Sequence, residues 1–237
     1  MTTIAVVPAA GLGKRMGDST RKQMLLLRGT PILDYTLDAL SSCDLIDGIL
    51  VMTHPDDLVC VKDERKIDEL FPKLIGILAG GAERQDTVFI ALEYLSRHIS
   101  NPKWVVIHDG VRPFVTQDCL NETIQQAYRH SAAIAAVPVT DTIKQVDTEG
   151  KWVLDTPDRS LIWAAQTPQC FRFSLAWEAH HAARENQLSG TDDASLVERI
   201  GVKIKVVMGS YDNIKITIPV DMIIGENILA ARGGKDT

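Results

Sequence analysis

Continuous apolar runs recur along the chain, and stretches with helical spacing separate them. The runs lie at residues 4–7, 48–52, 104–107, 134–137 and 203–207. Nearly all are too continuous for a strand with one wet face, so they are typical of central strands in a sheet covered on both sides. The spacing of Leu33, Leu37 and Leu40 indicates a helix between two of these runs. Residues 88–95 and 120–127 show the same helical spacing between other runs. This alternation predicts an α/β fold with a mostly parallel sheet.

The end of the chain predicts one more helix. Pro219 suits its first turn, and Gly233 and Gly234 follow its expected end near Arg232. Its candidates for burial are Ile223, Ile224 and Ile228.

One segment interrupts the alternation of strands and helices. Residues 143–146 and 151–154 flank Asp147-Thr148-Glu149-Gly150, which predicts a β-hairpin with a glycine-containing turn. We name residues 139–158 the arm. A two-stranded ribbon is marginally stable alone, so its Trp152 would gain from packing on a partner chain or on the chain's own domain. The sequence leaves both open.

Composition narrows the class of protein. The chain has 237 residues, 45% of them hydrophobic, and no repeat or linker, which favours one domain over residues 1–237. No apolar run approaches the roughly 20 residues of a membrane span, and no signal peptide is indicated, so we expect a soluble, non-exported, cytoplasmic protein. The net charge of -6 argues against nucleic acid as a partner. Its 4 cysteines are scattered, which predicts free thiols rather than disulfides or a structural metal site.

A small-residue turn follows the first predicted strand. Residues 8–17 read PAAGLGKRMG, in which backbone N–H groups are open to a phosphate or a base. The turn is neither a Walker A loop nor the dinucleotide fingerprint, because Met16 stands where the third glycine would be, which counts against a nicotinamide oxidoreductase. The remaining pattern, Gly-x-Gly-x-Arg with Lys22 nearby, suits a nucleoside triphosphate. The alternative is an ordinary tight turn with solvated cations.

Several further stretches, in their order along the chain, resemble the sugar-phosphate nucleotidyltransferases, and among them the methylerythritol phosphate cytidylyltransferase family. The resemblance covers nearly the whole chain, although Arg21 stands where the family usually has proline. Its landmarks are residues 8–16, Lys22-Gln23, Gly80–Val88, His108–Pro113, Pro138–Lys144, Asp158–Ser160, Trp163–Gln169, Thr191–Ala194 and Asp212–Thr217.

The resemblance implies a Rossmann-like nucleotidyltransferase domain with a protruding β-hairpin arm that joins a homodimer. The implied reaction transfers CMP from CTP to 2-C-methyl-D-erythritol 4-phosphate with the help of Mg²⁺, in the non-mevalonate route to isoprenoid precursors. The alternatives are a ribitol 5-phosphate cytidylyltransferase of wall polymer synthesis and a non-catalytic nucleotide-binding module. The second would be expected to lose Arg15, Lys22 or Asp109, and all three are present.

The resemblance also implies the roles of particular residues. Those expected at CTP are Ala9, Ala10, Gly11, Leu12, Gly13, Arg15, Lys22, Gly80, Gly81 and Thr87. Those expected at the polyol phosphate are Asp109, Arg112, Thr142, Arg159, Thr167 and Lys215, with Thr142 and Arg159 reaching the partner's site. Arg15, Lys22, Arg159 and Lys215 would be catalytic, by stabilising phosphate charge.

Some of these residues have structural alternatives. Asp109 follows a predicted parallel strand, where open α/β sheets place ligands, so it would hold Mg²⁺, accept from substrate hydroxyls or pair with Arg112. Without the resemblance, Lys215 is a solvated strand lysine, and Gly80-Gly81 precedes a helix that begins near Asp86 and is capped by Asp86 or Thr87.

Three other groups are expected to be structural. We expect a packed, hydrogen-bonded His108. Residues 191–194 predict a helix start capped by Thr191, and His180 and His181 are expected at the surface of another helix.

Overall fold

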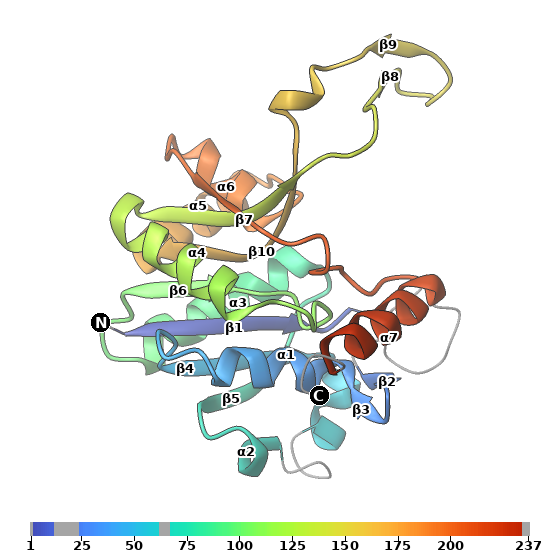
Figure 1. The fold of residues 1–237 in the computed structure, drawn as a ribbon. Helices are drawn as coiled ribbons and strands as arrows, with labels where there is room; N and C mark the ends of the chain where they lie inside the picture. Colours follow the sequence, from blue (N-terminus) through green and yellow to red (C-terminus); the bar gives the residue numbers. More distant parts are fainter. Residues whose placement is uncertain (1, 12–23, 62–66, 234–237) are drawn as a thin grey trace.

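The computed structural model describes residues 2–11, 24–61 and 67–233 (Figure 1). Leu12, Gly13, Arg15 and Lys22, which the sequence predicts to bind the nucleotide, lie outside the described residues.

A seven-stranded sheet crosses the described part of the chain. Its strands are β1 (Thr3–Ala9), β4 (Gly48–Thr53), β5 (Leu74–Ala79), β6 (Trp104–Ile107), β7 (Ala132–Pro138), β10 (Trp163–Arg172) and β11 (Lys205–Met208). They lie in the order β11-β7-β10-β6-β1-β4-β5. Only β10 runs antiparallel to the other strands of this sheet. The predicted α/β class with a mostly parallel sheet is confirmed.

The strand that the apolar pattern did not predict is β10. Polar residues interrupt it at Gln166-Thr167-Pro168, and its register with β7 shifts between Ala165 and Gln169. An interrupted strand shows neither a continuous apolar run nor strict alternation, so periodicity does not detect it. The interruption places Thr167 beside the end of β6, at the candidate site.

Helices cover both faces of the sheet. They are α1 (Ile32–Ser41) and α4 (Gln117–His130) on one face, and α3 (Arg84–His98), α5 (Phe173–Glu185) and α6 (Asp193–Arg199) on the other. Residues of β1 alternate between the two cores: Ala5 and Val7 join the first, and Ile4 and Val6 join the second. Burying a side chain such as valine or isoleucine stabilises the fold by roughly 1.5–3 kcal/mol, so both faces hold β1 in place.

The last helix, α7 (Pro219–Gly233), begins at the predicted residue. Its buried contact is unexpected, because Gly225 packs against Phe114 and any Cβ at Gly225 would lie 3.0 Å from that ring. Ile228 packs at the same core, but Ile223 and Ile224 are exposed. The expectation that all three isoleucines are buried is wrong for two of them in this single chain, because the glycine face turns inward.

The predicted hairpin is present and projects from the sheet (Figure 1). It consists of β8 (Gln145–Val146) and β9 (Val153–Asp155), which pair antiparallel. Asp147 shapes the turn, since its carboxylate accepts from the Lys151 amide at 2.9 Å. Trp152 is 74% exposed. In one chain, therefore, the arm does not pack on its own domain. The alternative in which it does so is not what the structure shows.

Two further expectations concern the chain as a whole. Cys43, Cys119 and Cys170 are buried, Cys60 is half-buried, and none of the four forms a disulfide, as the scattered positions predict. Over the described ranges, no helix combines the length and the apolar character needed to cross a membrane.

Candidate active site

Three loops meet where the parallel strands β1, β5 and β6 end. The loop after β5 comes close to the turn after β1, because a Cβ at Gly80 would lie 2.6 Å from the Cβ of Ala10. The loop after β6 comes close to the same turn, because a Cβ at Gly110 would lie 3.1 Å from the Cβ of Ala9. The sheet order changes direction between β1 and β6, which is where open α/β sheets bind ligands.

The loop after β5 leads directly into α3. This helix begins at Arg84, two residues before the predicted start. Thr87 is buried, and its hydroxyl donates to the Glu83 carbonyl at 2.9 Å and accepts from the Gly81 amide at 3.1 Å. Asp86 accepts from the Glu83 amide. The cap of this helix is Glu83, so the alternative in which Asp86 or Thr87 is the cap is wrong, although Asp86 completes the capping box as its third residue. Nucleotide contact by Thr87 stays a prediction.

Asp109 is the centre of a charged cluster just after β6. Its Oδ1 lies 3.0 Å from Arg84 Nε, and its Oδ2 lies 2.7 Å from Lys215 Nζ and 3.7 Å from Arg112 Nε. The carboxylate is 5% exposed. Lys215 is thus a partner of a buried acid rather than a solvated strand lysine, and the predicted pairing of Asp109 with Arg112 is present as well.

Burial and charge oppose each other in this cluster. Burial favours the neutral form of Asp109, but the nearby cations Arg84, Lys215 and Arg112 outweigh it and lower its pKa well below the usual range. The pKa of Arg84 is raised in the same way, because Asp193 and Asp109 outweigh the effect of its burial. Asp109 and Arg84 therefore both stay ionised over the whole physiological pH range.

His108 is packed and hydrogen-bonded, as expected. Its Nδ1 lies 3.0 Å from Thr167 Oγ1, and its Nε2 lies 3.2 Å from the Arg112 carbonyl. Burial lowers the pKa of His108 to about 4, so the ring is neutral at physiological pH. The Thr167 hydroxyl also accepts from the Asp109 amide at 3.0 Å. Thr167 therefore fixes the backbone of Asp109, beyond any hydroxyl that it offers to a substrate.

The loop after β11 brings Lys215 to this position. Arg112 NH1 donates to the Asn213 carbonyl at 2.6 Å, and the Ile216 amide donates to the Val111 carbonyl at 2.9 Å. The buried Asn213 side chain donates to the Thr167 carbonyl at 2.9 Å. These bonds join three loops that lie far apart in the sequence, which spacing along the chain could not reveal.

Two predicted substrate residues lie on the projecting segment instead. Thr142 and Arg159 are exposed, and Arg159 NH1 donates to the Thr140 carbonyl at 2.8 Å. Figure 1 shows the arm standing away from the ends of β1 and β6. A single chain therefore brings together Asp109, Arg112, Thr167 and Lys215, whereas Thr142 lies on the arm and Arg159 directly follows it.

A second charged group, which no sequence pattern predicts, lies next to this cluster. Arg84 NH2 lies 2.8 Å from Asp193 Oδ2, and Asp193 Oδ1 lies 3.1 Å from His180 Nε2. The expectation that His180 is at the surface is wrong: it is 1% exposed, because it turns toward Asp193, whereas His181 is exposed. Arg84 lies within Gly80–Val88, one of the stretches that resemble the family, and this resemblance is the sequence signal that could have pointed to it.

The start of α6 differs from the expected one by a residue. The cap is Asp192 rather than Thr191, and its Oδ1 accepts from the Ser195 amide at 2.9 Å. This leaves Asp193 in the first turn of the helix, free to turn inward to Arg84.

The ion pairs of Asp109 limit direct binding of a metal ion by its carboxylate. Both of its carboxylate oxygens are paired with cationic side chains, so a direct bond to Mg²⁺ would displace an ion pair. Among the described residues, no three His, Cys, Asp or Glu side chains cluster closely enough to hold a metal ion. A metal ion bound directly to Asp109 would therefore compete with Arg84 and Lys215 for its oxygens.

Comparison with known proteins shows the family of this chain. The model of a family described as IspD: 2-C-methyl-D-erythritol 4-phosphate cytidylyltransferase matches residues 3–231. The chain belongs to this cytidylyltransferase family. A protein of that name from Syntrophus aciditrophicus is 46% identical over 232 residues, which cover 98% of this chain and 97% of the relative. One from Geobacter metallireducens is 43% identical over 226 residues, 95% of this chain and 97% of the relative.

Solved structures of cytidylyltransferases share the fold. The structure of 4-diphosphocytidyl-2C-methyl-D-erythritol synthase from Anaerococcus prevotii has a TM-score of 0.83 and 30% identity, and covers 97% of this chain and 96% of its own. The cytidylyltransferase structure from Thermus thermophilus has a TM-score of 0.75 and 30% identity, with 97% and 100% covered. The predicted nucleotidyltransferase fold is confirmed.

Proposed function

We propose that residues at the carboxyl ends of β1, β5 and β6 bind CTP and 2-C-methyl-D-erythritol 4-phosphate side by side. As a member of its family, the chain is a cytidylyltransferase of the non-mevalonate isoprenoid route: it transfers CMP from CTP to the polyol phosphate and releases pyrophosphate. The observation that carries our assignment of the site is the Asp109 cluster, which adjoins the glycine turn after β1.

The proposed nucleotide site is the space bordered by two glycine-containing loops. Ala9 is the last residue of β1 and is followed by Ala10 and Gly11, and Gly80 and Gly81 follow the end of β5. The close approach of Gly80 to Ala10 supports a shared cradle, since small residues let a base and phosphates reach backbone groups. Residues 12, 13, 15 and 22 would complete the cradle, with Arg15 and Lys22 at the phosphates.

The proposed chemistry needs charge and position more than a base. A phosphate oxygen of the polyol substrate attacks the α-phosphorus of CTP, a new P–O bond forms, and the bond to the β-phosphate breaks with its electrons going to pyrophosphate. The attacking oxygen is already ionised, so no strong general base is needed. Two anions must meet, and cations that neutralise them supply the rate enhancement.

The four predicted catalytic cations divide into two pairs in this proposal. Arg15 and Lys22 stabilise the α-phosphate and the leaving pyrophosphate. Lys215 and Arg159 orient the phosphate of the polyol. Thr142 adds a hydroxyl donor, Thr167 holds the backbone of Asp109 in place, and Asp109 and Arg112 face the polyol. A divalent cation such as Mg²⁺, held mainly by the triphosphate, would neutralise part of its charge.

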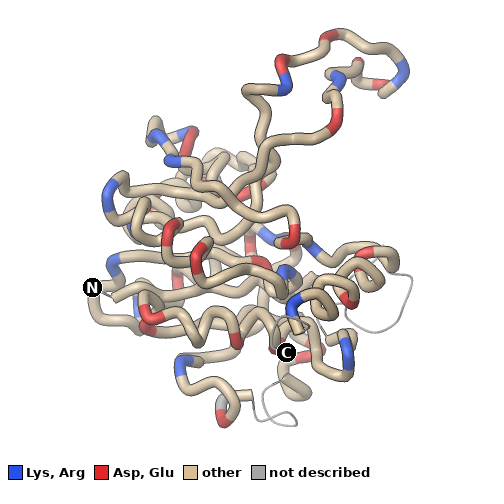
Figure 2. Tube along the Cα trace, in the orientation of Figure 1, with Lys and Arg blue, Asp and Glu red and all other residues tan. Residues whose placement is uncertain are grey.

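The arm supports a homodimer in which one subunit completes the partner's site. Arg159 and Thr142 are exposed, and the arm stands away from the ends of β1 and β6 in Figure 1. Leu154 and Leu161 add to the exposed apolar surface of this segment, at 63% and 77% exposure. Figure 2 shows charges of both signs along the arm, which suits a protein partner better than nucleic acid.

The experiment is pyrophosphate release from CTP and Mg²⁺, with 2-C-methyl-D-erythritol 4-phosphate compared with ribitol 5-phosphate. We expect a strong preference for the first acceptor. A preference for ribitol 5-phosphate would keep the mechanism and change the pathway, and release with neither would refute the assignment. In the same assay, Lys22→Ala is expected to lower kcat much more than it raises KM for the polyol phosphate, because Lys22 acts on the transition state; an unchanged kcat would refute that role.

A further inference from the structure

Arg84 connects two buried carboxylates from different parts of the chain. Its Nε lies 3.0 Å from Asp109 Oδ1, and its NH2 lies 2.8 Å from Asp193 Oδ2. Asp109 and Asp193 are 5% and 1% exposed. Because the guanidinium is a rigid planar fork, a partner that fixes one edge also fixes the direction of the other edge.

Asp193 is itself held firmly in place. His180 Nε2 lies 3.1 Å from its Oδ1, and the next backbone amide, that of Ala194, donates to the buried Gln169 side chain at 3.0 Å. The preceding residue, Asp192, caps α6 and accepts from Gln169 Nε2 at 2.7 Å. Asp193 therefore presents its carboxylate from a rigid helix start.

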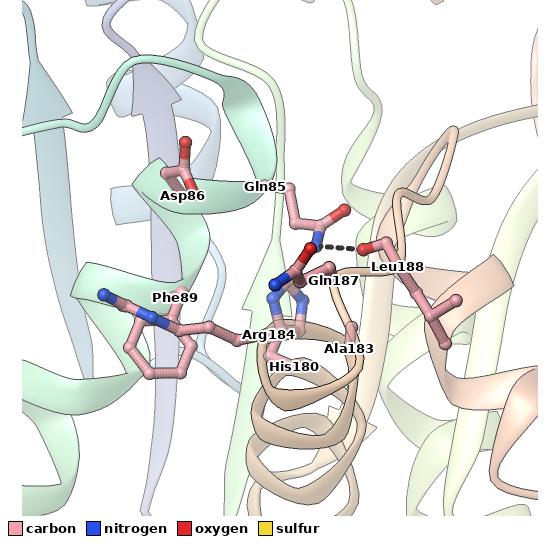
Figure 3. A pocket seen from close by; sticks show the side chains of 8 residues that line it. All are labelled: Gln85, Asp86, Phe89, His180, Ala183, Arg184, Gln187 and Leu188. Carbon is pink, nitrogen blue, oxygen red and sulfur yellow. Dashed lines mark hydrogen bonds between the residues drawn. The ribbon is translucent and has the colours of Figure 1, made fainter.

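The start of α3 is tied to the same region by a second residue. Gln85 Nε2 donates to the Leu188 carbonyl at 2.9 Å, and the Gly190 amide donates to Gln85 Oε1 at 2.9 Å. Figure 3 shows Gln85 reaching Leu188 across a pocket of about 210 Å³ that His180 also lines. Arg84 and Gln85 thus anchor the end of the proposed nucleotide loop to the segment that carries Asp193.

We infer that Asp193 is a positioning residue of the cytidylyl transfer, which acts by holding Arg84 and, through it, Asp109. This inference rests on the proposed site. The five charged groups Asp109, Asp193, Arg84, Arg112 and Lys215 sum to a charge of +1, which leaves positive charge for a substrate phosphate. Without Asp193, Arg84 keeps Asp109 as its one carboxylate partner among the described residues, so its second edge is no longer fixed and Asp109 Oδ1 loses a firmly held partner.

The loss of Asp193 has opposite effects on binding and on turnover. Removing a negative charge makes the site more attractive to an anion, so KM for the polyol phosphate should not rise. Misplacing the reacting groups slows the chemical step, since an error of about 1 Å costs roughly 100-fold in rate. We therefore expect Asp193→Asn to lower kcat at least tenfold with an unchanged or lower KM for 2-C-methyl-D-erythritol 4-phosphate.

The test measures kcat, KM and Tm for the full-length protein and its variants by pyrophosphate release. Glu198→Gln removes an equal charge from the exposed side of α6 and should leave kcat unchanged. Leu196→Ala makes a cavity under the same helix, and controls for destabilisation without a change of charge. Arg84→Lys keeps the charge but loses the fork, and is combined with Asp193→Asn in a double-mutant cycle.

If Asp193 acts through Arg84, the double variant should be little slower than Arg84→Lys alone. The inference is wrong if Asp193→Asn keeps kcat within twofold of the unmodified protein, or if Leu196→Ala lowers kcat as much as Asp193→Asn does. It is also wrong if the losses of kcat in Asp193→Asn and in Arg84→Lys multiply in the double variant. Should Asp193→Asn not fold, Arg84→Lys alone decides, because an unchanged kcat there also overturns the inference. The unmodified protein is measured first, since a lack of any pyrophosphate release would refute the proposed function itself.

Discussion

Lys215 Nζ lies 2.7 Å from Asp109 Oδ2, although the two residues come from opposite halves of the chain. The pair places a lysine that is 35% exposed beside a buried acid at the end of β6. Lys215 is therefore held by the protein and still open on one side to an incoming anion. This arrangement suits a cation that must meet a substrate phosphate in a fixed position.

Replacement of Lys215 should weaken both binding and turnover. We expect Lys215→Met to lower kcat/KM for 2-C-methyl-D-erythritol 4-phosphate roughly 10- to 100-fold, since a charge-assisted hydrogen bond contributes about 1.5–3 kcal/mol. Lys205→Met, which removes an exposed lysine from β11, is the matched control. Steady-state pyrophosphate release measures both, and equal values for the two variants would contradict the assigned role.

Gly80 should not tolerate a side chain. A Cβ there would lie 2.6 Å from Ala10 Cβ and 2.9 Å from Thr87 Oγ1, so Gly80→Ala must push the two nucleotide loops apart. We expect KM for CTP to rise about tenfold or more and Tm to fall, because overpacking costs about 1–3 kcal/mol. Gly233→Ala is the control, since a Cβ there meets no atom within 4 Å. An unchanged KM for CTP in Gly80→Ala would argue against the shared cradle.

Two inactive variants should restore activity when they are mixed. If Arg159 serves the partner's site, a dimer of one Lys215→Met subunit and one Arg159→Gln subunit has one intact site. After complete subunit exchange, half of the dimers are mixed, so we expect about a quarter of the natural activity. Each variant alone is the control, and sedimentation reports the dimer.

No gain on mixing, with a dimer shown by sedimentation, would mean that each arm serves its own chain. A monomer at micromolar concentration would remove the dimer proposal altogether.

His108 should make stability depend on pH. Its pKa is about 4 in the folded chain, below the usual 6.5, so the unfolded chain binds the extra proton first as the pH falls. The free energy of unfolding should therefore decrease from about pH 6.5 to pH 4, by on the order of 3 kcal/mol in total. The measurement is urea unfolding at a series of pH values.

His108→Gln should flatten this decrease, while His130→Gln, at an exposed position, should not. An equal slope in the unmodified protein and in His108→Gln would show that another group causes the decrease. Asp109 lowers the free energy of unfolding further only at lower pH. Its pKa is lowered in the folded chain, so its contribution to stability disappears as it becomes protonated.

Several features follow from the sequence by itself. Continuous apolar runs determined most strands of the sheet, and Pro219 determined the start of the last helix. The turn Asp147–Gly150 determined the hairpin, and the position of Asp109 just after a strand placed it at the binding edge. All of these depend on residues within a few positions of one another, where the pleat, the helical repeat and turn geometry act directly.

Which distant residues meet depends on the folded arrangement of the loops. It brought Lys215 to Asp109, joined Arg84 to Asp193 and buried His180, because these contacts depend on how the loops close around the sheet. Spacing along the chain carries no information on such pairs. The antiparallel strand β10 escaped prediction for a related reason: its polar interruption breaks the local pattern, and its neighbours β6 and β7 hold it in the sheet.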